Sequence, residues 1–505
     1  MAETRIPETV PRPHAHDTIR WWILLTVIIG TFLGRLDQTI VNLALPKIID
    51  DFGITTSAAG WIATAYILAN AIFVPIWGKL GDTIGRKRVY ILGFSIFIFG
   101  SVLAGLSWNL NSMIIFRIIQ AIAGSADYPT AMAILAVTFR AGRERAQALG
   151  IWSASFAAAA VFGPLVGGPL IDLFGWRAVF LINLPVGIVG LIMAITFVDE
   201  SVSAKKTVHF DWWGAITLGI ALSGLVLVLD KGNDWGWNSW QSVACYAICV
   251  VFFVIFYFID RVHPEPIVDF KFFKHPVFVN VLINNFIVFM GMMGSVFLIP
   301  LFASTFLGYD ATHIGYLFLP MAAAMLIASP IGGALTGRVQ PRYVIMASTF
   351  VTAIGLFLFH FMLDPRATAI DIMLPIAVLA FGMGFGMAQR TNIIASIVPE
   401  DEMGIASSIL ALARNIAGAF GIAIFSTILT NSIYSNVMAT ARNSVVHAVT
   451  SIQYSQAVAL IILHADIMSY KTVFLVSACV VFIGGLGAWF IKIKEMKTGV
   501  EVMVD

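Results

Sequence analysis

Long apolar segments follow one another along nearly the whole chain. They are continuous and rich in Leu, Ile, Phe and Ala, without polar residues at every second position. A helix needs roughly 20 apolar residues to cross the hydrocarbon core of a bilayer, whereas the strands of a membrane barrel alternate apolar and polar residues. The pattern therefore predicts an all-α integral membrane protein with 14 transmembrane helices. The expected spans are 22–46, 58–77, 89–107, 112–137, 147–170, 178–197, 212–229, 241–259, 277–306, 312–335, 343–363, 371–396, 404–431 and 470–491.

Composition supports a membrane protein. The 505 residues are 59% hydrophobic and 11% charged, whereas a soluble domain has roughly 25% charged residues. The net charge of +2 gives no indication of a nucleic-acid partner. The first apolar run is not followed by a small-residue cleavage site, so we expect it to be a retained span.

Lys and Arg residues gather in alternate connections between the expected spans, for example in 78–88, in 140–145 and after 491. Basic residues accumulate on the cytoplasmic side of membrane proteins. The alternation holds along the chain, which predicts that both termini are cytoplasmic. The longest connection, 432–469, is then an outside loop.

The chain contains an internal repeat. The segment 78–88 (GKLGDTIGRKR) follows the second span, and a degenerate copy, 333–342 (GALTGRVQPR), follows the tenth. Two six-helix halves with two extra helices between them account for this spacing. The expected organisation is a cytoplasmic tail (1–21), an N-terminal six-helix bundle (22–200), two additional helices with loops (201–275), a C-terminal six-helix bundle (276–495) and a second tail (496–505).

Four further motifs occur in order: 36–46 (LDQTIVNLALP), 117–120 (RIIQ), 163–168 (GPLVGG) and 176–187 (WRAVFLINLPVG). Together with 78–88 they resemble the major facilitator superfamily, and within it the fourteen-helix drug:proton antiporters (EmrB/QacA-like). The resemblance implies the major facilitator fold, namely two six-helix bundles plus two extra central helices. It also implies antiport, with the acid of the first span binding protons or substrate.

Asp37 and Arg117 are charged residues inside apolar spans. Asp37 lies nine residues before Pro46, about 13 Å from that end of the span. Arg117 is at a similar depth in the fourth span, so the two side chains can pair. Charged residues inside membranes usually mark ion or proton pathways. We therefore expect both to serve proton coupling, the alternative being a purely structural ion pair.

Asp127 is a second intramembrane acid, ten residues beyond Arg117 and about 15 Å deeper. On a helix, Arg117, Gln120 and Asp127 share one polar face. We expect Asp127 to be another proton- or cation-binding carboxylate. The alternative is a pair with Arg35, which points away from Asp37 and needs an anion.

The fifth span has no side chains at Gly163, Gly167 and Gly168, and Pro164 removes a helix hydrogen bond. Glycines let another helix approach closely. We expect this segment to form a bending contact between the two halves, and the resemblance implies that it is the antiporter motif.

The 78–88 segment has the residues of a cytoplasmic gate. Asp82 can cap the N-terminus of a neighbouring helix, and Gly85 permits a tight turn. Arg86 can pair with an acid, and Gly78 begins the motif. The alternative is that the segment only orients the protein in the membrane, which explains its basic residues but not the Gly and Asp spacing.

Arg390, nine residues before Pro399, is expected to extend its charge to the cytoplasmic surface.

The substrate cavity is expected to join polar and apolar residues from both halves. The expected cavity residues are Asp37, Gln120, Asp127, Phe156, Met290 and Met293.

The predicted function is proton-coupled multidrug efflux of hydrophobic, often cationic molecules across the bacterial cytoplasmic (inner) membrane. The alternatives are export of one endogenous metabolite, such as a siderophore, fatty acid or antibiotic, or a polytopic membrane enzyme. No phosphate-binding Gly-rich loop or catalytic motif is present. We therefore expect no enzyme activity, cofactor or metal. The expected partners are drugs, protons and membrane lipids, with a periplasmic adaptor and an outer-membrane channel as a further option at 432–469.

Overall fold

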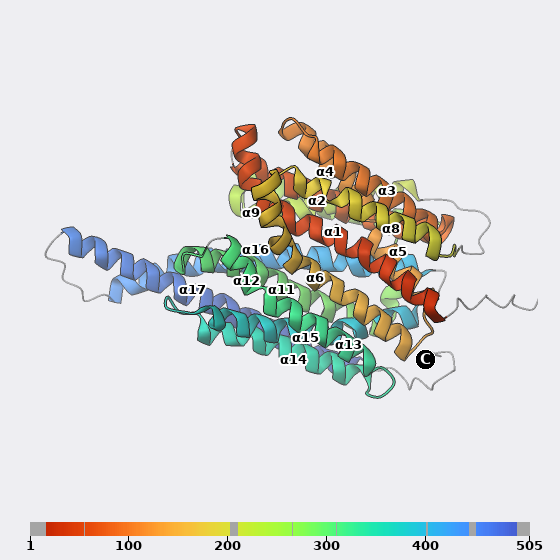
Figure 1. Cartoon of the computed structure of the whole chain (residues 1–505). Helices are drawn as coiled ribbons and strands as arrows, with labels where there is room; N and C mark the ends of the chain where they lie inside the picture. Colours follow the sequence, from red (N-terminus) through yellow and green to blue (C-terminus); the bar gives the residue numbers. More distant parts are fainter. Residues whose placement is uncertain are drawn as a thin grey trace, which may run out of the picture.

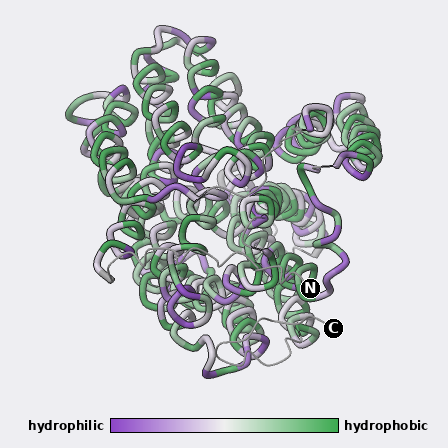
Figure 2. Tube along the Cα trace, turned by 90° about the vertical axis from the view of Figure 1, so that its right-hand side faces the viewer, coloured by the Kyte–Doolittle hydropathy of each residue, from purple (hydrophilic) through white to green (hydrophobic). Residues whose placement is uncertain are grey.

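The computed structural model describes residues 17–54, 56–201, 211–264, 266–309, 311–399, 402–443 and 451–491. Regular structure in this part of the chain is helical throughout. The long helices run side by side in roughly one direction (Figure 1). Seen end-on, hydrophobic residues predominate along them (Figure 2). Twelve helices in the described part are long and apolar enough to cross a membrane.

The first half of the chain forms helices that correspond to the first six expected spans. They are α1 (Asp17–Phe52), α2 (Thr56–Ile84), α3 (Arg86–Gly105), α4 (Leu110–Gly124), α5 (Asp127–Thr138), α6 (Arg143–Phe174), α7 (Ala178–Leu181) and α8 (Asn183–Phe197).

The second half begins with the two additional helices and continues with the second bundle. The additional helices are α9 (Trp212–Trp235) and α10 (Trp240–Val262), and the short helix η1 (Phe270–Lys274) follows them. The remaining helices are α11 (Pro276–Phe306), α12 (Ala311–Leu317), α13 (Leu319–Ala334), α14 (Pro341–Met362), α15 (Ala369–Ile397), α16 (Met403–Asn443), α17 (Ser451–Gly487) and η3 (Ala488–Phe490).

The helices group into two bundles with a pair between them. Most helices of α1 to α8 pack mainly on one another, as do those of α11 to α17, while α6 also packs extensively on α13 and α15 of the second group. Helix α9 packs against α2 of the first bundle and α16 of the second, and α10 packs on α9. We call the end of the bundles that carries Asp82 the Asp82 end, and the opposite end the Pro46 end.

The fourth expected span is interrupted. Helix α4 ends at Gly124 and α5 begins at Asp127, so neither piece alone is long enough to count as a span. Pro129 explains the break, because it has no N–H for the Ser125 carbonyl and its ring crowds that group. The fifth expected span lies within α6, whose Leu165–Phe174 part is apolar. With these two segments still candidates, the count of fourteen stays a prediction.

The prediction that residues 432–469 form a loop is largely wrong. Helix α16 continues to Asn443 and α17 begins at Ser451, so only residues 444–450 lie outside the described helices. The two helices project together from the rest of the molecule (Figure 1). Similarly, α1 begins at Asp17, inside the expected tail 1–21. Residues 1–16 and 492–505, which include the second expected tail, lie outside the described residues.

Candidate functional site

Asp37 is the centre of a buried polar cluster in the first bundle. Its side chain in α1 has no exposed surface. Arg117 of α4 places Nη1 2.5 Å from Asp37 Oδ2. The amide groups of Gln120 and Asn183 donate hydrogen bonds to Asp37 Oδ1, over 2.9 and 3.0 Å. The predicted pairing of Asp37 with Arg117 is confirmed.

Three members of this cluster were not predicted. Asn183 of α8 also donates to Ser101 Oγ at 2.8 Å, and the Arg117 guanidinium lies 4.1 Å from the centre of the Tyr66 ring. The available signal was the position of Asn183, an amide inside an apolar span and within the 176–187 motif. Ser101 and Tyr66 gave no such signal, because single hydroxyl groups are common in apolar helices.

The cluster stabilises a charge away from water. Removing one partner of a buried ion pair costs about 3–5 kcal/mol, because the other charge is left uncompensated. Here the carboxylate of Asp37 has one cationic partner and two amide donors. One buried carboxylate therefore joins α1, α4 and α8.

Asp127 forms a separate site. Its Oδ2 accepts a hydrogen bond from Thr31 at 2.8 Å, and Thr31 Oγ1 accepts one from Trp152 at 2.9 Å. Within the described part of the chain, its buried Oδ1 has no hydrogen-bond partner. A small cavity beside Asp127 is lined by Gly30, Gly34, Tyr90, Gly93, Phe94, Phe97, Ala123 and Gly124. The continuous polar face expected on the fourth span is thus divided into two parts. Arg117 and Gln120 bind Asp37, whereas Asp127 binds Thr31.

Arg35 faces the fifth expected span. Its guanidinium lies 5.0 Å from the centre of the Phe156 ring of α6, and its Nη1 donates to Gln38 at 3.1 Å. Among the described residues, no ion pair joins Asp127 to Arg35: Asp127 accepts from Thr31, and Arg35 donates to Gln38. The alternative interpretation of Asp127 as a direct partner of Arg35 is therefore wrong.

Arg414 of α16 reaches across to the first bundle. Its Nη1 donates a hydrogen bond to the Tyr128 hydroxyl of α5. Within the second bundle, it donates to Thr391 at 3.2 Å and to Asn285 at 3.4 Å. Its guanidinium also lies 4.9 Å from the centre of the Phe289 ring. Arg414 therefore joins the two bundles near their middle.

Arg390 is buried instead of reaching the surface, so the expectation that its charge extends to the cytoplasmic surface is wrong. Only 1% of its surface is exposed. Its Nε donates to Asn284 Oδ1 at 2.7 Å, and its Nη2 donates to Ser348 and Thr349 at 3.0 and 3.1 Å. Neutral oxygens from α11 and α14 keep the side chain inside the bundle.

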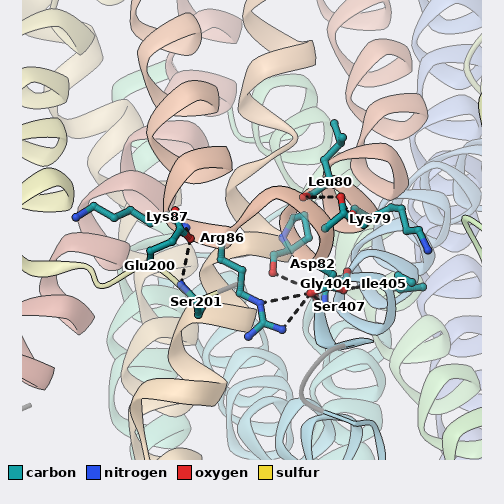
Figure 3. A network of polar contacts seen from close by, with 12 residues as sticks. Lys79, Leu80, Asp82, Arg86, Lys87, Glu200, Ser201, Gly404, Ile405 and Ser407 are labelled. Atoms are coloured by element: carbon teal, nitrogen blue, oxygen red, sulfur yellow. Dashed lines mark hydrogen bonds and ion pairs between the residues drawn. The ribbon is translucent and has the colours of Figure 1, made fainter. Parts of the chain in front are cut away.

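The expected gate joins the two bundles. Asp82 Oδ1 and Oδ2 accept hydrogen bonds from the backbone N–H groups of Gly404 and Ile405, each at 3.0 Å, in the first turn of α16. Arg86 Nη2 lies 3.0 Å from Asp82 Oδ1. Figure 3 shows Arg86 and the start of α16 converging on Asp82. The turn between the two helices requires Gly85, whose φ is +112°. The predicted capping, pairing and turn are confirmed.

Close backbone approach makes the gate tight. A Cβ atom at Gly78 would lie 2.5 Å from the carbonyl oxygen of Gly404. The second contact between the bundles, from α6 to α13, is equally close. A Cβ at Gly150 would lie 2.8 Å from Ser329 O, and one at Gly333 would lie 2.5 Å from Ala146 O. Both contacts lie toward the Asp82 end, so the bundles are closed there.

The GPLVGG segment packs within the first bundle. A side chain at Gly163 would strike Thr39, and one at Gly167 would strike Ile40, both on α1. The expectation that these glycines contact the other half is therefore wrong. Gly168 faces open space. The antiport role of the segment, including Pro164, stays a prediction.

Of the expected apolar cavity residues, Phe156 lies at the bundle interface, beside Arg35 and 6.0 Å from the Tyr128 ring. Met290 and Met293 lie on α11 and contact α16 at Gly421 and Gly418. Their role as cavity residues stays a prediction. Within the described ranges, no group of three or more His, Cys, Asp or Glu side chains is placed to hold a metal ion.

Two helical bundles that meet at a polar contact, with buried charges beside their interface, are the architecture of many secondary transporters. The family model of the Major Facilitator Superfamily matches residues 27–422. The chain belongs to this superfamily. Its members are transporters, so the chain is a transporter and not an enzyme.

Two relatives come from Bacillus subtilis (strain 168). The multidrug transporter protein MdtP is 33% identical, and the match covers 81% of this chain and 75% of MdtP. Multidrug resistance protein 3 is 31% identical, over 81% of this chain and 80% of that protein. Among solved structures, the proton:xylose symporter XylE has the same fold, with a TM-score of 0.63 and 15% identity, over 95% of this chain and 97% of XylE.

Proposed function

We propose that the chain exports drug-like small molecules in exchange for protons. The observation that supports this proposal is the buried Asp37 cluster, in which one carboxylate inside the apolar bundle joins three helices. The names of the two multidrug relatives support drug-like cargo. The coupling has a physical basis, because a carboxylate inside a membrane is costly unless it is paired or protonated.

We place the Asp82 end in the cytoplasm of a bacterial cell, because Lys and Arg gather in the connections at that end. In the proposed cycle, the site exchanges with the outside while the Asp82 end is closed. In this state Asp37 takes up an external proton, and cargo leaves. Opening of the Asp82 end then releases the proton inward and admits new cargo. A periplasmic adaptor, if one is used, would meet the projecting ends of α16 and α17.

The available driving force is adequate. One proton moving through about 150 mV supplies roughly 3.5 kcal/mol. Since about 1.4 kcal/mol corresponds to a factor of ten, one proton per molecule sustains a gradient of a few hundred-fold.

The test is uptake of fluorescent aromatic probes into liposomes that contain the purified protein, with the lumen made acidic. We expect uptake to stop when an ionophore collapses the pH gradient. Asp37→Asn should abolish gradient-driven uptake, because Asn cannot exchange a proton, while downhill exchange of probe persists. Asp50→Asn, an exposed acid of the same helix, is the matched control and should behave as wild type. Uptake that is independent of the gradient would refute the proposal.

A further inference from the structure

Two arginines stand on opposite sides of the interface between the bundles. Arg35 is on α1 of the first bundle, and Arg414 is on α16 of the second. Tyr128 of α5 lies between them, with its hydroxyl bonded to Arg414 and its ring near Phe156, over which Arg35 lies. The two guanidinium groups are linked through these rings: Arg35 lies 5.0 Å from the centre of Phe156, Arg414 lies 5.0 Å from the centre of Tyr128, and the two ring centres are 6.0 Å apart.

Neither arginine has an acidic partner among the described residues. In the described part of the chain, no carboxylate forms an ion pair with Arg35 or Arg414, and their hydrogen-bond partners are Gln38, Tyr128, Thr391 and Asn285. These partners are neutral, so they satisfy N–H groups without cancelling charge.

The surrounding charges increase the imbalance. Arg390 precedes Thr391, which accepts a hydrogen bond from Arg414, and among the described residues Arg390 too is held by neutral oxygens alone. Of the described acids near this interface, Asp127 is hydrogen-bonded to the neutral Thr31 and Asp37 is already paired with Arg117. Three cations thus face at most one available carboxylate. Buried charges of one sign are costly unless a counter-ion approaches.

The walls of this interface are aromatic. Phe156 and Tyr128 line the side of the first bundle, and Phe289 lies beside Arg414 on the other side. Flat rings bind flat apolar molecules by stacking, while a guanidinium group binds carboxylate, sulfonate or phosphate through paired N–H donors.

We propose that Arg35 and Arg414 form an anion-binding site for cargo, which receives the carboxylate, sulfonate or phenolate group of an aromatic molecule. That this molecule is exported rests on the proposed function, while the binding itself does not. The site favours anionic cargo, in contrast to the cationic cargo expected from the sequence. In this structure the Tyr128 hydroxyl occupies part of the Arg414 fork, and a bound anion takes its place.

The test uses three probes that share one pyrene body: 1-pyrenesulfonate, neutral 1-pyrenemethanol and a pyrenylmethyl-trimethylammonium cation. Binding to purified protein in lipid nanodiscs is measured by fluorescence anisotropy, with binding to empty nanodiscs subtracted. We expect the wild-type protein to bind the sulfonate at least tenfold more tightly than the cation.

Variants separate the site from a general effect on structure. Arg35→Gln and Arg414→Gln should each weaken sulfonate binding about tenfold or more, while binding of the neutral probe is kept. Arg414→Lys should retain part of the affinity, because it keeps the charge but not the fork. Arg366→Gln, which removes an exposed charge between α14 and α15, should change nothing. A variant that no longer binds the neutral probe either has lost its structure. The proposal is then tested by the wild-type protein alone, through its relative affinity for the sulfonate and the cation.

Equal or tighter binding of the cation by the wild-type protein would overturn the proposal, as would unchanged sulfonate binding in both Gln variants. The liposome assay distinguishes the two proposals. If the sulfonate binds but no probe moves under a proton gradient, the site stands and the export function fails. If only the cation moves and binds, the export function stands and the anion site fails.

Discussion

At the scale of single residues, the buried arginines are stabilised in two ways. Arg117 has the carboxylate of Asp37 as its partner. Arg390 and Arg414 instead rely on the oxygens of amide and hydroxyl groups, supplemented for Arg414 by the faces of aromatic rings. The difference depends on what the facing helix offers at the same depth. The first arrangement fixes a neutral pair, and the second leaves a positive charge for a ligand.

Asn183 provides a test of the Asp37 cluster. Asn183→Leu keeps the approximate volume but removes the donor to Asp37 Oδ1 and to Ser101. A buried acceptor that loses its donor costs about 1–3 kcal/mol. We expect a lower midpoint of thermal unfolding in detergent for this variant. Asn111→Leu, at an exposed position in the first turn of α4, should leave the midpoint unchanged, and equal midpoints for the two variants would contradict the role of Asn183.

The depth of a residue in the membrane, counted from the end of its span, predicted some interaction partners and not others. Asp37 and Arg117 lie at matching distances from the Pro46 end, and opposite charges at one depth inside a membrane usually meet. The partners of Arg390 gave no comparable signal, because Asn284, Ser348 and Thr349 are neutral and come from two other helices. Its distance from Pro399 suggested that it reached the surface, but the rotation of α15 points the side chain inward.

At the scale of elements, helix ends are fixed by residues from elsewhere in the chain. The first turn of α16 is capped by Asp82, which belongs to the other bundle. At the Pro46 end, the side chains of Trp176 and Arg177 donate to Asp51 near the end of α1. These two hydrogen bonds lower the pKa of Asp51, which lies outside the membrane span. Because of contacts of this kind, the position of a helix end depends on the position of the neighbouring segment.

The cap on α16 can be weakened by Asp82→Asn, which removes the charge and the pair with Arg86. Hydrogen bonds to a charged group contribute about 1.5–3 kcal/mol, so the closed state should lose roughly tenfold or more in population. A cysteine at Ser408, which is fully buried beside Gly78, should then react faster with a membrane-impermeant maleimide. The matched control is Asp199→Asn, at an exposed position. Equal reaction rates in the two backgrounds would show that the cap does not hold the gate closed.

Two features of the elements were missed for identifiable reasons. The break in the fourth span follows from Pro129, which was overlooked within a long apolar run. The ends of α16 and α17 have mixed polar and apolar residues. A helix that leaves the bilayer needs no continuous apolar surface, so this composition resembled a loop.

At the scale of the whole molecule, the two bundles meet through small residues and backbone at the Asp82 end. The approaches of α6 to α13 and of α2 to α16 leave no room for a side chain at Gly150, Gly333 or Gly78. Such contacts have few intermediate arrangements, because packed interfaces cannot deform continuously. The molecule is therefore expected to switch between a closed and an open state at this end.

A disulfide across this interface should lock the transporter. The side-chain amide of Asn415 on α16 donates a hydrogen bond to that of Asn70 on α2 at 3.1 Å, so Asn70→Cys with Asn415→Cys brings two thiols face to face across the interface. The native Cys245, Cys249 and Cys479 are first replaced by Ala. We expect oxidation to stop probe uptake and reduction to restore it, while the single-cysteine proteins are insensitive. Full activity of the oxidised double variant would show that this interface need not open.

Helix α16 begins at the gate, passes Arg414 and continues to Asn443 without a proline. Its 41 residues make a rod of about 60 Å, twice the thickness of the hydrocarbon core. A rod fixed at one end acts as a lever: a tilt of about 10° at Asp82 moves a tip about 60 Å away by roughly 10 Å. A tilt of α16 that accompanies opening of the gate is therefore expected to move the projecting tip far enough to be measured. Energy transfer between one donor dye and one acceptor dye in a single molecule would follow this movement in real time.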